Sequence, residues 1–139
     1  NFPLSWNTEV LKVFFQMETT LGVPVEWAKK ELPRWVFGTS SHIAFRCLNL
    51  PEIQDVWKHI DGPIITTSLN KSGESPITRF EDAMNFIQPY GKEVIIVGKG
   101  NTCSGESSTI VFWKNDNFEI IREGRNLKQI EEQLGLLTT

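Results

Sequence analysis

The sequence is poor in the residues that mark metal modules, disulfide scaffolds and membrane proteins. Its 139 residues include two cysteines, Cys47 and Cys103, and two histidines. The cysteines form neither a CxxC pair nor a dense framework, which argues against a zinc module and a small disulfide-rich fold. No uninterrupted apolar run reaches the length of a membrane span, and no basic region followed by a hydrophobic stretch opens the chain. We therefore expect no bound metal, no membrane segment and a cytoplasmic location.

Positive charge is also scarce, because 14 Lys and Arg are set against 17 Asp and Glu, giving a net charge of −3. Overall charge therefore does not hold this chain on nucleic acid, although the composition does not exclude a local basic groove. The chain is 40% hydrophobic and contains five Trp and nine Phe, which is typical of a filled core. The length predicts a single domain over residues 1–139.

Apolar residues recur at helical spacing in several segments. Asn7 is a suitable N-cap for the first, and Gly22 a suitable end. Pro24 suits the first turn of a short second helix, and Thr78 with Glu81 reads as a capping box. The spacing predicts helices over residues 7–22, 24–32, 49–62, 78–87 and 126–134.

Runs rich in β-branched and aromatic residues alternate with these helices. They predict strands at residues 35–37, 42–48, 64–68 and 93–98, and a hairpin formed by 108–113 and 118–122 around a turn at Asn115–Asn117. Helices that alternate with strands indicate an α/β fold.

The segment from Gly62 to Gly73, GPIITTSLNKSG, is the first candidate site. Its apolar residues give way within a few positions to hydroxyl, amide and glycine residues, as happens where a strand end meets a ligand. Such a loop suits a phosphate or a carboxylate. An ordinary strand-to-helix connection has the same composition, so both interpretations stay open here. Ser104–Thr109 is a second loop of this kind.

Two arginines are further candidates. Arg46 lies inside an apolar run, where a guanidinium is costly unless it reaches water or an anion. Arg122 follows two isoleucines at the end of the hairpin. The alternative for Arg46 is an edge-strand arginine that reaches solvent. The alternative for Arg122 is a surface ion pair with a neighbouring acid. Gly98–Gly100 lacks the Walker pattern, and Gly105–Ser107 lacks the second glycine of a nucleophile elbow, so neither indicates a known catalytic loop.

Three segments together resemble the YrdC-like family of threonylcarbamoyl-AMP synthases. The family's Ser-x-Asn and Ser-Gly signature is similar to TTSLNKSGE at 66–74. Its Ser-Thr-Val-Val strand entry is similar to SGESSTIV at 104–111. Its Ile-Leu-Arg-x-Gly motif is similar to IIREG at 120–124. HIAFRCLN and NFPLSW also resemble family segments. The resemblance covers residues 1 to about 124 and implies a twisted mixed sheet with helices packed against it.

The resemblance implies a role for each matching residue. Arg46, Thr66 and Ser108 would bind L-threonine, while Ser68, Asn70 and Arg122 would bind ATP. The implied reaction joins L-threonine, bicarbonate and ATP into threonylcarbamoyl-adenylate for the t6A modification of tRNA. Mg²⁺ would accompany ATP, no protein nucleophile would be needed, and tRNA or other proteins of the t6A pathway are implied partners.

The family's N-terminal strand-helix-strand portion, which carries a Lys-x-Arg motif, has no counterpart in residues 1–139. Two expectations follow. Either residues upstream of Asn1 supply that portion, or the chain is a reduced relative. The second gives the alternative function of a catalytically incomplete module that binds RNA or a nucleotide.

Overall fold

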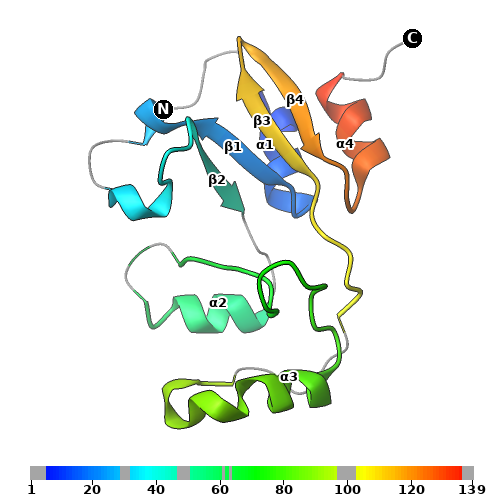
Figure 1. Cartoon of the computed structure of the whole chain (residues 1–139). Helices are drawn as coiled ribbons and strands as arrows, with labels where there is room; N and C mark the ends of the chain where they lie inside the picture. The colour runs from blue at the N-terminus through cyan, green and yellow to red at the C-terminus, as the bar shows by residue number, and fades with distance from the viewer. Residues whose placement is uncertain are drawn as a thin grey trace. The chain divides into compact units, whose positions relative to one another are not determined.

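The computed structural model describes residues 6–28, 32–46, 51–60, 62, 64–96 and 103–135 (Figure 1). Residues 1–49 and 107–139 form one compact unit, which we call the sheet unit, and residues 50–106 form a second, the helical unit. Each is described by itself, and the expected single domain over 1–139 stays a prediction. Within the described part of the chain, no helix has the length and apolar character needed to cross a membrane.

The sheet unit contains a four-stranded sheet in the order β2-β1-β3-β4. β1 pairs antiparallel with β2 and parallel with β3, and β3 pairs antiparallel with β4. This mixed sheet with its helices confirms the predicted fold class. The elements of the unit are α1 (Thr8–Gln16), β1 (Thr20–Pro24), η1 (Val25–Trp27), η2 (Arg34–Val36), β2 (His42–Arg46), β3 (Ile110–Lys114), β4 (Asn117–Arg122) and α4 (Leu127–Leu134).

Local sequence chemistry accounts for several of these boundaries. The side chain of Asn7 accepts a hydrogen bond of 3.0 Å from the backbone N–H of Val10 and so caps α1. Asn115 and Asp116 have φ of 49° and 58°, which is the backbone of a type I′ hairpin turn between β3 and β4. Gly135, at φ 66°, ends α4 in the left-handed conformation. The predicted helix at 126–134 and the predicted hairpin are confirmed.

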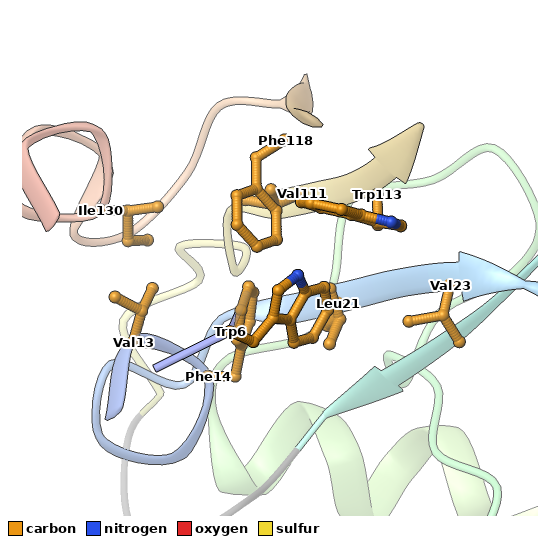
Figure 2. Close-up of a cluster of buried hydrophobic side chains, with 9 residues drawn as sticks. All are labelled: Trp6, Val13, Phe14, Leu21, Val23, Val111, Trp113, Phe118 and Ile130. Carbon is orange, nitrogen blue, oxygen red and sulfur yellow. The ribbon is translucent and has the colours of Figure 1, made fainter. Parts of the chain in front are cut away.

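Nine buried apolar side chains fill the space between one face of the sheet and the helices α1 and α4. Trp6 lies inside this cluster, 5.1 Å from the ring centre of Phe118 and 5.2 Å from that of Trp113 (Figure 2). Val13 of α1 and Ile130 of α4 have no exposed surface. Burial of this apolar area is the main favourable term for the unit. The cluster consists of Trp6, Val13, Phe14, Leu21, Val23, Val111, Trp113, Phe118 and Ile130.

Gly22 is a buried strand residue and does not end a helix as the sequence suggested. It pairs with Phe112 in β3, and the Phe112 ring occupies the space that a side chain at Gly22 would need. The same ring stacks on His42 with centroids 4.6 Å apart. Close approach of a neighbouring ring therefore explains why this position suits glycine.

Other predictions for the sheet unit need correction. The helix predicted over 7–22 ends at Gln16, because Thr20 to Pro24 pair with β2 and Thr20 to Gly22 pair with β3 as well. Among the described residues of 24–32, Val25–Trp27 form a 3₁₀ turn in place of a helix, and the strand expected at 35–37 is replaced by a 3₁₀ turn at Arg34–Val36. The strand at 42–48 is confirmed as far as Arg46, and Cys47 lies outside the described residues.

The helical unit contains α2 (Pro51–Trp57), α3 (Phe80–Ile87) and the 3₁₀ segment η3 (Gln88–Glu93). The helix predicted over 49–62 is confirmed only from Pro51 to Trp57, and the one predicted over 78–87 is confirmed as α3. Arg79 is the N-cap of α3 and no side chain makes a capping hydrogen bond, so the predicted capping box is wrong. Residues 64–68 and 93–96 lie in no strand. None of the unit's described residues is buried, and Ile95 is 88% exposed.

We predict that Gly22→Ala lowers the free energy of unfolding by about 1–3 kcal/mol, because its methyl group overlaps the Phe112 ring. Urea denaturation of the variant and the parent measures the loss. In a Phe112→Ala background the same change should cost much less, since the clashing ring is gone. An equal loss in both backgrounds would contradict the clash.

Candidate functional site

Arg46 and Arg122 lie in one row that crosses the sheet. Thr20 of β1 pairs with Arg46 of β2 on one side and with Ile110 of β3 on the other, and Ile110 pairs with Arg122 of β4. Paired residues present their side chains on the same face of a sheet. This face is opposite the one that carries Leu21 and the core, because Thr20 and Arg46 alternate with Leu21 and Phe45 along their strands. Between β3 and β4 a register shift at Ile110 and Val111 interrupts the alternation, and Arg122 reaches this face through its contact with the Ser108 hydroxyl, which bonds to Thr20.

Ser108 and Arg122 are in direct contact. The Nη2 group of Arg122 lies 2.9 Å from the backbone oxygen of Ser108 and 3.4 Å from its Oγ, and Nε lies 3.3 Å from the same backbone oxygen. Ser108 is buried, whereas Arg122 is exposed. Within the described part of the chain, the Nη1 group of Arg122 makes no hydrogen bond. The guanidinium is thus held on one side and open to an anion on the other.

Thr20 connects Ser108 to β1. Its Oγ1 lies 2.8 Å from the Oγ of Ser108, and its backbone N–H donates to the backbone oxygen of Thr109 at 2.9 Å. Thr109 has no exposed surface, and its hydroxyl donates to the backbone oxygen of Arg125 at 2.8 Å. These bonds fix the segment that carries Ser108 between β1 and the residues after β4.

Glu18 places a carboxylate beside Arg46. Its Oε2 lies 3.7 Å from the Nη2 of Arg46 and 2.9 Å from the Nη1 of Arg125, and the latter contact is a hydrogen bond. The side chain of Arg46 is 34% exposed and that of Glu18 is 24% exposed. Arg46 thus contacts an acid, and a third of its side chain also reaches solvent from β2, which is an edge strand, as the alternative for this residue predicts.

Gly124 allows the chain to approach this site closely. The backbone N–H of Arg125 donates to Ser107 at 2.9 Å, and Ser108 forms a parallel bridge with Arg125. A Cβ on Gly124 would lie 2.7 Å from the backbone carbon of Ser108 and would overlap the backbone oxygen of Ser107. Steric overlap with the backbone therefore explains why position 124, in the IIREG segment, suits glycine.

The other three predicted residues belong to the helical unit. Thr66 and Ser68 are exposed in an extended segment without strand partners. The hydroxyl of Ser68 donates to the Oδ1 of Asn70, and the Nδ2 of Asn70 donates to the backbone oxygens of Lys71 at 2.8 Å and Glu74 at 3.1 Å. Asn70 therefore organises the loop, while Ser68 and Thr66 present polar atoms to solvent.

The structure thus brings Arg46, Ser108 and Arg122 together in the sheet unit, and Ser68 and Asn70 together in the helical unit. That the two groups face one ligand stays a prediction. Cys103 is exposed, and no cluster of three His, Cys, Asp or Glu side chains occurs among the described residues. Gly98–Gly100 lies outside the described residues.

Three residues of the sheet-unit site were not predicted from the sequence: Glu18, Thr20 and Arg125. Glu18 and Thr20 fell inside a segment read as one long helix. The β-branched pair Thr19-Thr20, followed by the alternation of Leu21 and Val23, was the available signal for a strand. The hydrogen bond between Arg125 and Glu18 joins residues 107 positions apart, so no local sequence pattern predicts it.

Comparisons of the sequence with known proteins identify a family and several relatives. The Sua5/YciO/YrdC family model, described as telomere recombination, matches residues 7–124. The chain is similar to the threonylcarbamoyl-AMP synthase of Wigglesworthia glossinidia brevipalpis, with 33% identity over 100 residues, which cover 69% of this chain and 47% of the relative. It is also similar to that of Hydrogenovibrio crunogenus, with 31% identity over 80 residues, which cover 55% of this chain and 41% of the relative.

A third relative, the threonylcarbamoyl-AMP synthase of Coxiella burnetii, is 39% identical over 57 residues, which cover 39% of this chain and 31% of the relative. The chain therefore matches less than half the length of each of these curated relatives. No solved structure matches it significantly.

We predict that Gly124→Ala lowers the free energy of unfolding by roughly 1–3 kcal/mol, because a Cβ there pushes the backbone of Ser107 and Ser108 away. Urea denaturation measures the loss, and hydrogen exchange of the Arg125 amide should accelerate as its bond to Ser107 weakens. The neighbouring exposed residue supplies the control, since Glu123→Ala should stay within about 0.5 kcal/mol. Unchanged exchange in the glycine variant would show that the close approach is unimportant.

Proposed function

The chain belongs to the Sua5/YciO/YrdC family, and we propose that it takes part in forming threonylcarbamoyl-adenylate from L-threonine, bicarbonate and ATP. Its similarity to curated threonylcarbamoyl-AMP synthases supports this reaction. The observation that carries the proposal is the row Arg46, Thr20, Ile110 and Arg122 across the sheet, with Ser108 bonded to both Thr20 and Arg122. Two guanidiniums and two hydroxyls suit a ligand that carries a carboxylate and phosphates.

Arg46 is proposed to bind the carboxylate of L-threonine. A planar guanidinium donates two parallel hydrogen bonds to a carboxylate, which fixes the direction in which the amino group points. Thr66 and Ser108 are proposed to contact the same amino acid through their polar atoms. Orientation of the amine matters because it must combine with bicarbonate to give a carbamate.

Arg122 is proposed to face the phosphates of ATP, with Ser68 and Asn70 as further contacts. Its Nη2 and Nε groups are held by Ser108, so its outer edge has a fixed direction toward an anion. In the reaction, a carbamate oxygen forms a bond to the α-phosphorus and the bond to pyrophosphate breaks. The chain then acts by positioning the two reactants and by stabilising the negative charge that develops on the phosphates.

Mg²⁺ is proposed to enter with ATP as its counter-ion. The described residues offer no cluster of carboxylate or imidazole ligands, which fits a cation held by phosphate oxygens and water in place of a protein cage. The adenylate would then serve the t6A modification of tRNA, with tRNA or proteins of that pathway as partners.

The first test is pyrophosphate release from ATP by the natural protein that contains this chain. We expect release that requires both L-threonine and bicarbonate. Pyrophosphate release at the same rate without L-threonine would indicate that another molecule accepts the adenylyl group. No release, together with RNA or nucleotide binding that weakens steeply with salt, would favour the alternative of a binding module.

The second test separates the two arginines. Arg46→Ala should raise the KM for L-threonine more than that for ATP, and Arg122→Ala should do the reverse. Each effect should reach about tenfold or more, since a hydrogen bond to a charged group is worth roughly 1.5–3 kcal/mol. Arg34→Ala removes an exposed arginine of the same unit and serves as the control. Equal effects of the two variants on both substrates would refute the assigned roles.

A further inference from the structure

Glu18 is an acidic residue in contact with Arg46, and the role proposed above does not use it. Its carboxylate oxygen Oε2 lies between two guanidiniums, at 2.9 Å from Arg125 and 3.7 Å from Arg46. The first distance is a hydrogen bond, whereas the second exceeds hydrogen-bond length and leaves only charge attraction. Glu18 is therefore anchored on Arg125 and has a loose contact with Arg46.

We propose that Glu18 sets the affinity of this site for the substrate carboxylate by competing with it for Arg46, an inference that rests on the proposed function. A carboxylate beside Arg46 offers the same chemistry as the carboxylate of an amino acid. The two negative charges also repel each other, since like charges a few ångströms apart disfavour one another. Substrate must therefore displace or outcompete an acid that is already present.

The anchoring by Arg125 makes this displacement possible. When Arg46 turns to a ligand, Glu18 keeps its hydrogen bond to Arg125 and is not left as an unpaired half-buried charge. The backbone holds Glu18 in place as well, because its φ of 52° is a left-handed conformation that few residues adopt without surrounding support. The contact between Glu18 and Arg46 is weak because Glu18 is held by Arg125 at 3.7 Å from Arg46. Such an acid weakens the binding of a ligand to Arg46 without blocking it.

The test compares Glu18→Gln with the parent by measuring L-threonine binding calorimetrically. Gln keeps the size of the side chain and removes its charge, so we expect the Kd for L-threonine to fall about threefold to fivefold, the size of effect that partly exposed ion pairs have. Glu123→Gln removes the same charge from an exposed position beside Arg122 and should leave this Kd unchanged. L-Threoninol, which lacks the carboxylate, should not distinguish Glu18→Gln from the parent.

Glu18→Asn is the second variant, because Asn tolerates a left-handed backbone better than Gln does. It should tighten L-threonine binding in the same direction. If the parent binds L-threonine and both variants bind it equally or more weakly, Glu18 does not compete and the inference is overturned.

A readout that needs no substrate separates this inference from the proposed function. Phenylglyoxal modification of Arg46, followed by mass spectrometry of its peptide, should be several-fold faster in Glu18→Gln, with exposed Arg34 as the internal reference. If no variant binds L-threonine but Arg46 is modified faster, the proposed function fails while the competition for Arg46 stands. Unchanged modification of Arg46 would overturn the competition whatever the substrate.

Discussion

The parallel pairing of β1 with β3 brings together segments that are distant in the chain. It places Thr20 opposite Ile110, and the hydroxyls of Thr20 and Ser108, 88 residues apart, lie 2.8 Å from each other. Through β1 it also joins β2, which carries Arg46, to the hairpin that carries Arg122. Removing this one pairing would separate the two arginines, so the core that supports β1 and β3 supports the site as well. Leu21 and Val111, which are paired and buried on the other face, link the two.

Much of the sheet unit could be predicted from local chemistry. The turn at Asn115 and Asp116, and the Gly135 that ends α4, carry residues whose backbone preferences are strong and independent of distant partners. Helices with clear apolar spacing were also predictable, at α1, α2, α3 and α4. The errors fall where distant contacts decide. Gly22 suits a helix end by its own preference, but its strand partners and the Phe112 ring determine its conformation.

Some residues of the candidate site could likewise be predicted from the sequence, and others could not. Arg46 was noticeable from its sequence position alone, since a guanidinium within an apolar strand calls for a reason. The roles proposed for Ser108 and Arg122 rest on resemblance, whereas their direct contact is seen in the structure. Glu18 and Arg125 were unpredictable, because an ion pair across 107 residues leaves no periodic trace in either segment. The expected strand at 64–68 has no strand partner among the described residues, so the apolar run of Ile64 and Ile65 was read too strongly as a sheet signal.

Arginine suits the position of Arg122 better than lysine for a physical reason. Two of its nitrogens are held by Ser108, which fixes the plane of the guanidinium, and the opposite edge keeps its donors for an anion. A lysine ammonium at the same place could bond to the backbone oxygen of Ser108 or to a phosphate, but it has no rigid fork with which to do both in a set direction. Gly124 and Thr109 hold the backbone that supplies this oxygen, one by close approach and the other by its bond to Arg125. The orientation of one exposed charge thus depends on residues that themselves carry none.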